Sequence, residues 1–194
     1  MSHVDDQEFE RAWWGNCANT YQEETKQMVY ANRMGLTAIE HSGKYPVYDL
    51  GDKSVIDIGG GPVSMLLKAV NPGDLQVIID PCAYPGWTQL RYADAGIIRF
   101  ENPAEKFFPQ LEGKFDEAWI YNVLQHVEDP AKIVENAKRY AKTVRLFEWI
   151  DMPAHEGHPH ELTEASLSEW LGVPGTVEEL SESGCYGRAF YAIA

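Results

Sequence analysis

The sequence has few cysteines and no long apolar run. Its three cysteines, Cys17, Cys82 and Cys185, are far apart and show no C-x-x-C spacing, which argues against a disulfide framework and against a zinc site. No apolar run approaches the length of a bilayer span, so we expect no membrane association. The opening stretch "MSHVDDQEFERAWW" is acidic and lacks the apolar segment of a signal peptide. We therefore expect a cytoplasmic protein with reduced thiols.

Basic residues are also scarce. The chain has 16 lysines and arginines against 30 aspartates and glutamates, which gives a formal net charge of −14. Such a charge repels phosphate backbones and disfavours binding to bulk nucleic acid. With 194 residues, of which 44% are hydrophobic, the chain is long enough for one globular domain with a sizeable core. We expect a single domain over residues 1–194.

Strand and helix patterns alternate from residue 53 onward. This alternation predicts a mostly parallel sheet with helices on both faces. The predicted strands are "KSVIDI", "LQVIID", "IIRF", "FDEAWIYNV" and "TVRLFEWI". The predicted helices are "MLLKAV", "GWTQLRYADAG" and "DPAKIVENAKRYAK", the last with Asp129 as N-cap and Pro130 in its first position.

The two ends of the chain have different patterns. Residues 6–36 are predicted to be helical, with Thr20 as an N-cap in capping-box spacing to Glu23 and with Gly35 as a C-cap. Near the other end, "LTEASLSEWLG" predicts a helix capped by Thr163. The strands "TVEELSES" and "GRAFYAIA" then face each other across "GCYG", which predicts an antiparallel hairpin. The expected fold is α/β and doubly wound, with a mostly parallel seven-stranded sheet and a C-terminal antiparallel hairpin.

The stretch "SVIDIGGGPVS" (54–64) joins the first of these strands to a glycine turn. A dinucleotide fingerprint requires G-x-G-x-x-G, but after Gly59 and Gly61 the third position is Ser64. Asp57 would also face an anionic pyrophosphate. A cationic ligand fits better: S-adenosylmethionine carries a sulfonium and an amino group, and its carboxylate can accept backbone N–H groups at the turn. Glycines allow the backbone to approach such a ligand closely.

Four stretches occur in the order typical of one family. "VIDIGGGP" resembles motif I of the class I S-adenosylmethionine-dependent methyltransferases, and "VIID" ends in Asp80, at the position where that family binds the ribose hydroxyls. "FENPAEKFFPQLEGKFD" and "FDEAWIYNVLQHVEDP" resemble its third motif and its fourth-strand signature. The resemblance implies a cofactor-binding core over residues 53–150 and a helical N-terminal lid over residues 1–45. A substrate-side loop, a helix and the hairpin would follow over residues 151–194.

The resemblance also implies which residues bind S-adenosylmethionine, at the strand ends and in the lid. They are Trp14, Tyr21, Asp57, Gly59, Gly60, Gly61, Asp80, Pro81, Asn102, Ala104, Asn122 and Val123. The third motif departs from the family pattern, because Pro103 stands where an acid often holds the adenine amino group. We expect that contact to shift to Asn102 or Glu105, with the Ala104 N–H available to a ring nitrogen.

Methyl transfer needs alignment of the reactants, and it needs a base only if the acceptor must lose a proton. The candidate catalytic residues are His126 and Glu148. His126 is either a base near the sulfonium or a histidine that packs at a helix start. Glu148 is either a substrate contact or base, or a surface carboxylate. The loop "HEGHPH" (155–160) is read as solvated or substrate-facing, and no metal site is expected.

These observations favour an S-adenosylmethionine-dependent methyltransferase that acts on a small-molecule acceptor, and the oligomeric state stays open. One alternative is a regulatory or partner subunit that binds S-adenosylmethionine or S-adenosylhomocysteine without turnover. Another is an NAD-dependent oxidoreductase, against which Ser64 in the third glycine position argues.

Overall fold

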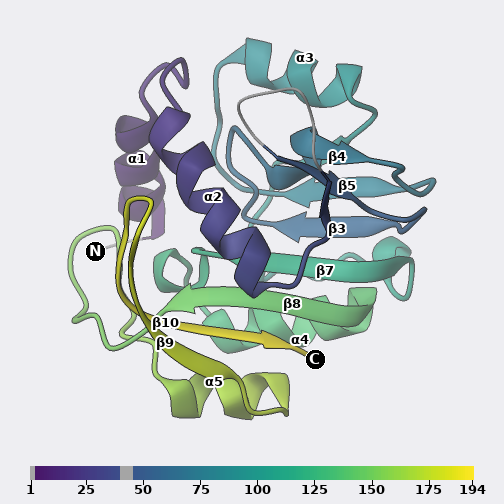
Figure 1. Cartoon of the computed structure of the whole chain (residues 1–194). Helices are drawn as coiled ribbons and strands as arrows, with labels where there is room; N and C mark the ends of the chain where they lie inside the picture. The colour runs from purple at the N-terminus through teal and green to yellow at the C-terminus, as the bar shows by residue number, and fades with distance from the viewer. Residues whose placement is uncertain (1–2, 40–45) are drawn as a thin grey trace.

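The computed structural model describes residues 3–39 and 46–194, so residues 1–2 and 40–45 of the predicted lid lie outside the described residues. Its main feature is a seven-stranded sheet in the order β6-β5-β3-β7-β8-β10-β9 (Figure 1). The first five strands in this order are parallel, and β10 runs antiparallel to both β8 and β9. The predicted fold class is confirmed. The strands are β3 (Val55–Ile58), β5 (Gln76–Ile79), β6 (Ile98–Phe100), β7 (Phe115–Tyr121), β8 (Ala141–Trp149), β9 (Thr176–Glu182) and β10 (Cys185–Ile193).

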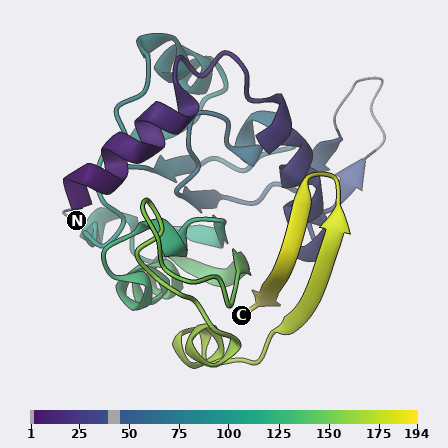
Figure 2. The same cartoon turned by 90° about the vertical axis from the view of Figure 1, so that its left-hand side faces the viewer.

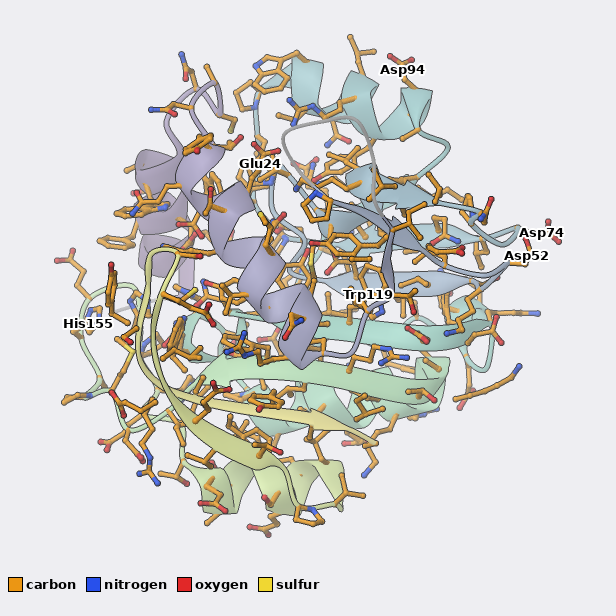
Figure 3. All side chains as sticks on the ribbon, viewed as in Figure 1. Glu24, Asp52, Asp74, Asp94, Trp119 and His155 are labelled. Carbon is orange, nitrogen blue, oxygen red and sulfur yellow. The ribbon has the colours of Figure 1, made fainter. Side chains whose placement is uncertain are left out.

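Helices cover both faces of this sheet, and every residue of β3 and β5 is therefore buried. On one face lie α2 (Tyr21–Arg33) and α3 (Gly86–Asp94), which pack on a core that includes Trp119 of β7. On the other face lie α4 (Pro130–Tyr140) and α5 (Glu164–Leu171). Trp119 is the largest fully buried side chain and lies at the centre of the molecule in Figure 3.

The helix boundaries near the end of the chain follow the predicted caps. Asp129 accepts a hydrogen bond from the Lys132 N–H at 3.0 Å, and Pro130 occupies the first turn of α4. Thr163 and Ser166 form a reciprocal capping box at the start of α5. The helix ends at Gly172, whose φ of 82° is the left-handed conformation that glycine adopts without strain.

The predicted helix "MLLKAV" is wrong. The segment forms one 3-10 turn, η1 (Met65–Lys68), followed by the short strand β4 (Ala69–Val70). β4 pairs with β2 (Val47–Asp49), which pairs in turn with β1 (Ala38–Ile39) in a second sheet that the sequence analysis missed. Asn71 at a φ of 50° and Pro72 after it end the segment, and sheet pairing satisfies its backbone instead of a longer helix.

Two local predictions also need correction. The Thr20 hydroxyl does not cap α2; it donates to Glu24 at 3.5 Å, because Thr20 already has a nearly helical backbone with ψ of 6°. In the hairpin, Ser183 and Gly184 form the reversal rather than "GCYG", since Cys185 already pairs with Glu182. Both reversal residues have positive φ, 51° and 81°, which is the pattern of a two-residue type I′ turn.

Helix α1 (His3–Trp14) belongs to neither face of the sheet. It runs across the carboxyl ends of the parallel strands, on the side that faces the viewer in Figure 2. The loop 151–163 lies on the same side, and His155 in it is labelled at the left of Figure 3. Among the described residues, no helix is long and apolar enough to cross a membrane.

A buried ion pair holds the opposite, amino-terminal end of the sheet. Glu117 of β7 accepts two hydrogen bonds from the Arg145 guanidinium, at 2.7 and 2.8 Å, and one from Lys53 Nζ at 2.7 Å. The Trp119 indole N–H adds a fourth, at 3.0 Å. Although burial alone would raise the pKa of Glu117, these partners lower it to about 2. The carboxylate is therefore charged at neutral pH.

We expect Glu117→Gln to lower the free energy of unfolding by about 3 kcal/mol at neutral pH, because a pKa of about 2 in place of 4.5 corresponds to that much linkage energy. In the wild type this stabilisation is complete above pH 4.5 and is lost as the pH falls through 2. Chemical denaturation at several pH values measures the effect. Glu112→Gln, which breaks the exposed pair with Arg139, should cost less than about 1 kcal/mol. Equal losses in the two variants would contradict the assignment.

Candidate functional site

A cavity of about 510 Å³ lies at the carboxyl ends of the parallel strands, within the range of roughly 300–1,000 Å³ typical of small-molecule sites. Its walls come from α1, α2, the loops after β3, β5 and β7, the loop 151–163 and the tip of the β9–β10 hairpin. Open α/β sheets bind ligands at this edge, where the chain crosses from one face of the sheet to the other. The lining residues include four carboxylates, Glu10, Glu23, Asp80 and Glu105, and one lysine, Lys26.

The glycine turn after β3 forms part of the wall. Gly59 and Gly61 have φ values of 75° and 62°, and both line the cavity. A Cβ atom on Gly59 would lie 2.4 Å from Val123 Cγ2, so the turn and the segment after β7 are in direct contact. A Cβ atom on Gly61 would lie 3.7 Å from the Trp14 ring, which brings α1 over the turn. Only glycine permits both the backbone conformation and the close approach at position 59.

Asp80 lies beside the glycine turn, directly after β5. It is only 4% exposed and lines the cavity. One carboxylate oxygen accepts from the Gly61 N–H and the other from the Cys82 N–H, both at 2.9 Å. Burial raises the pKa of Asp80, although these N–H donors and Arg99, 3.7 Å away, act in the opposite direction. The carboxylate thus fixes two loops and keeps lone pairs for further hydrogen-bond donors.

Asp57 does not line the cavity, although the resemblance implied that it binds the cofactor. It is 0% exposed, and one carboxylate oxygen accepts from Ser64 Oγ at 2.5 Å and from Tyr121 Oη at 2.6 Å. Burial raises the pKa of Asp57 to about 7 against the effect of these hydrogen bonds. A Cβ atom on Gly60 would lie 2.9 Å from the same oxygen. Asp57 therefore fixes the inner side of the glycine turn.

Glu148 is also buried rather than exposed. The carboxylate of this last-but-one residue of β8 is 0% exposed and does not line the cavity. One of its oxygens accepts from the Val123 N–H at 2.9 Å and from the Leu124 N–H at 3.0 Å. Burial raises its pKa to about 7. The sequence analysis considered Glu148 as a surface carboxylate or as a direct substrate contact. Its buried position outside the cavity lining fits neither description. Glu148 supports the segment between β7 and α4.

The segment between β7 and α4 carries five residues of the cavity wall, Asn122, Val123, Gln125, His126 and Val127. Asn122 has a φ of 56°, and its backbone N–H donates to the Phe147 carbonyl at 2.9 Å, which extends the sheet pairing by one residue. Asparagine tolerates this left-handed conformation better than most residues. The next turn, η3 (Leu124–His126), then directs the chain toward the 151–163 loop.

His126 contacts two segments that are far from it in sequence. Its Nδ1 lies 3.0 Å from Glu10 Oε1 on α1 and 2.8 Å from the Gly157 carbonyl oxygen. Its ring centre is 4.2 Å from that of His158, which in turn is 4.2 Å from that of His155. Burial favours the neutral imidazole, but Glu10 and the Gly157 carbonyl outweigh it and raise the pKa of His126. The pKa of His158 falls to about 4, mainly through burial and the neighbouring His126.

The structure brings most of the predicted site residues together at this cavity. Those that line it are Trp14, Gly59, Gly61, Asp80, Pro81, Ala104, Asn122, Val123 and His126. The lining does not include Tyr21, Asp57, Gly60, Asn102 or Glu148. The side chain of Asn102 accepts from Lys106 Nζ at 3.0 Å instead. Glu105, the other residue considered for the adenine contact, does line the cavity.

The sequence analysis missed several lining residues on α1, α2 and the end of β8. Glu10 gave no signal, because its contact with His126 joins positions more than a hundred residues apart. Trp149 also lines the cavity, and its ring centre lies 6.4 Å from that of Tyr30. Both are aromatic residues in elements predicted to pack on the core. Within residues 3–39 and 46–194, no group of three or more histidine, cysteine, aspartate or glutamate side chains is arranged to hold a metal ion.

Comparison with solved structures identifies the fold. An S-adenosylmethionine-dependent methyltransferase from Aquifex aeolicus superimposes with a TM-score of 0.58 at 15% identity, over 100% of this chain and 98% of that one. The chain has the methyltransferase fold. The 1,6-didemethyltoxoflavin N1-methyltransferase of Burkholderia thailandensis, solved with its substrate and S-adenosylhomocysteine, gives 0.62 at 14% identity over 98% and 86% of the two chains.

The same fold occurs in a protein that is named for a different reaction. The cyclase SpnF superimposes with a TM-score of 0.52 at 18% identity, over 78% of this chain and 55% of its own. No family model matches the sequence, and a comparison with curated proteins finds no match. The methyltransferase fold therefore does not fix the reaction, and the chemistry has to be argued from the site.

We expect Gly59→Ala to lower the free energy of unfolding by about 3 kcal/mol or more, because it combines a left-handed backbone with a contact of 2.4 Å to Val123. Gly96→Ala is the matched control. Gly96 has a φ of 72°, but a Cβ atom there meets nothing within 4 Å, so only the backbone strain of about 1–2 kcal/mol applies. Denaturant unfolding measures both variants. A Gly59→Ala protein as stable as the Gly96→Ala protein would rule out the close approach.

We expect Glu148→Gln to reduce the fall in stability that accompanies a rise in pH from 4.5 through 7. A carboxyl whose folded-state pKa is about 7 favours folding at low pH and costs on the order of 3 kcal/mol once it must ionise. The glutamine oxygen still accepts from the Val123 and Leu124 N–H groups. Unfolding curves between pH 4 and 8 test this, with Glu179→Gln on the exposed edge strand as control. An unchanged slope in Glu148→Gln would mean that this carboxyl titrates normally.

Proposed function

We propose that the chain binds S-adenosylmethionine in this cavity and transfers its methyl group to a small-molecule acceptor. The observation that carries the proposal is the meeting of the Gly59–Gly61 turn with Asp80 in a cavity lined by four carboxylates and one lysine. A sulfonium and an ammonium group are stabilised in such surroundings, whereas a pyrophosphate is not. The fold and the bound S-adenosylhomocysteine of the Burkholderia enzyme point in the same direction.

Asp80 is suited to the ribose. Each of its oxygens already accepts one backbone N–H, and each has a second lone pair. Two vicinal hydroxyls could donate to these positions, and the backbone bonds would hold the carboxylate in place as they do so. Gly59 and Gly61 present no side chain to the ligand, so the backbone of the turn can contact the methionine part directly.

Glu105 is the better candidate for the adenine amino group. Its Oε1 accepts from the backbone N–H groups of Glu128 and Asp129, at 2.9 and 3.3 Å, which orients the carboxylate. Ala104, beside it, also lines the cavity. Asn102 lies outside the cavity lining, so we do not assign it this contact. Trp14, close above Gly61, would cover the ligand from α1, and in this way α1 would act as a lid that excludes water.

S-adenosylmethionine supplies a methyl carbon bound to a positively charged sulfur, and the acceptor's lone pair forms its bond to that carbon as the carbon–sulfur bond breaks and the electron pair stays on sulfur. The protein has to align the two partners in line and exclude water. Asn122 and Val123, at the end of β7, lie where they would border the reacting groups. His126 could take the proton of an acceptor that must lose one.

Two alternatives predict different measurements. A regulatory or partner subunit would bind the same ligand without turnover. An NAD-dependent oxidoreductase would need a donor-rich site for a pyrophosphate. The lining carboxylates argue against it, and so does Ser64, whose hydroxyl bonds to Asp57.

The three cysteines are free thiols, which accords with the proposed cytoplasmic location.

Calorimetric titration with S-adenosylmethionine and S-adenosylhomocysteine tests the proposal. We expect micromolar dissociation constants, about −8 kcal/mol, and no binding of NADH. Asp80→Asn should weaken both ligands by roughly tenfold or more, the effect of losing charge-assisted hydrogen bonds.

The matched control is Asp74→Asn, an exposed carboxylate in the loop before β5, which should bind as the wild type does. A folded protein that binds neither ligand would refute the proposal. Binding without any methyl transfer from labelled S-adenosylmethionine to a mixed pool of small metabolites would favour the non-catalytic subunit.

A further inference from the structure

The contact between Glu10 and His126 joins α1 to the segment between β7 and α4, and both residues line the cavity. Glu10 lies on α1, and its Oε1 is 3.0 Å from His126 Nδ1. The Gly157 carbonyl oxygen, from the loop 151–163, is 2.8 Å from the same nitrogen. Two segments that are far from His126 in sequence therefore meet at its imidazole. The His126 side chain is 16% exposed and lines the cavity.

We propose that Glu10 is a positioning residue that holds His126 in the tautomer with the proton on Nδ1, so that Nε2 faces the cavity as a proton acceptor. The inference rests on the proposed function, because it assigns His126 the proton of the methyl acceptor. The inference gives Glu10, on α1, the role of orienting the base. The orientation of His126 then depends on the position of α1 over the cavity.

The tautomer follows from the partners of Nδ1. An ionised carboxylate oxygen and a backbone carbonyl oxygen are both hydrogen-bond acceptors, and neither can donate. Nδ1 must therefore carry a hydrogen in the neutral as well as in the protonated imidazole. In the neutral ring, Nε2 is then the nitrogen with the free lone pair. Among the described residues no hydrogen bond to Nε2 is formed.

The packing of α1 against the loop keeps this arrangement in place. Gly157 has a φ of 77°, and a Cβ atom on it would lie 2.4 Å from the Phe9 ring. The loop therefore lies directly against Phe9, the residue that precedes Glu10 in α1. His155 and His158 close the loop through two backbone hydrogen bonds of 3.0 Å. If α1 moved away, Glu10 would leave His126, and the loop would lose the contact between Gly157 and the Phe9 ring.

The charged and titratable groups around the imidazole support the same assignment. Glu10 faces it from α1, His158 faces it from the loop with His155 behind, and Glu148 lies nearby on β8. Burial alone would raise the pKa of Glu10, but the hydrogen bond and charge of His126 lower it overall. His158 is neutral above a pKa of about 4. Glu10 is thus the anion that stabilises the imidazolium formed when Nε2 accepts a proton.

In the reaction, the acceptor's bond to the methyl carbon forms as the carbon–sulfur bond breaks, and the acceptor's proton moves to Nε2. His126 becomes an imidazolium that donates from Nδ1 to Glu10, and the proton later leaves to water. The step needs no further reactant. In many enzymes, a general base accepts a proton from the nucleophile while a third group binds the base. That third group fixes the orientation and the tautomer of the base.

The test uses a reagent that attacks the free lone pair. Diethyl pyrocarbonate modifies unprotonated imidazole nitrogens, and peptide mass spectrometry reports the rate at His126 as a function of pH. Nitrogen-15 NMR of the imidazole reports its tautomer. In the wild type we expect the Nδ1–H tautomer, a rate midpoint above pH 6.5, and slower modification of His126 when S-adenosylhomocysteine is bound.

Glu10→Gln removes the charge and keeps the shape, so the midpoint should fall by roughly one pH unit. Glu8→Gln, which changes an exposed carboxylate of the same helix, should leave it unchanged. An unaltered midpoint in Glu10→Gln, or a wild-type proton on Nε2, would overturn the inference. If S-adenosylhomocysteine does not bind, the proposed function fails, but the midpoints in the ligand-free protein still decide whether Glu10 positions His126.

Discussion

The carboxyl edge of the sheet depends on one constraint: a carboxylate removed from water must find hydrogen-bond donors. Asp57, Asp80 and Glu148 lie at or next to the carboxyl ends of β3, β5 and β8, and each is almost fully buried. An unpaired carboxylate in such a place would cost several kcal/mol. Each one therefore takes donors from the loops beside it, namely the Ser64 and Tyr121 hydroxyls and the backbone N–H groups of Gly61, Cys82, Val123 and Leu124. These bonds fix the loops after β3, β5 and β7, which form part of the cavity wall.

The two ends of the sheet handle charge in opposite ways. At the amino end, Glu117 meets Arg145 and Lys53, and its pKa drops to about 2, so the ion pair stabilises the fold. At the carboxyl end, the partners of Asp57 and Glu148 among the described residues are hydroxyl and backbone donors rather than cations, and burial raises both pKa values to about 7. Both carboxyls lie outside the cavity lining and fix the chain segments that form part of its wall. The stabilising ion pair and the cavity thus lie at opposite ends of the sheet.

The sequence predicted the parts of the molecule that local patterns determine. Strand and helix alternation indicated the sheet, and the resemblance of "VIDIGGGP" and "VIID" to methyltransferase motifs pointed to the glycine turn and to Asp80. The helix predicted at residues 65–70 was wrong, since pairing with a strand from residues 47–49 decided its conformation. Asp57 and Glu148 were recognised as important acids, but only burial distinguishes a residue that shapes a loop from one that faces a ligand. Glu10 could not be found at all, because its partner is set by the position of α1 over the sheet.

The most direct test of this account is a crystal structure of the protein with S-adenosylhomocysteine. The account predicts the ribose hydroxyls at Asp80, the glycine turn against the amino-acid part of the ligand, and backbone shifts of less than about 1 Å at the buried carboxylates, since preorganised sites move little on binding. Ligand density elsewhere, or an Asp80 side chain that turns away from the ribose and releases the Gly61 N–H, would contradict it.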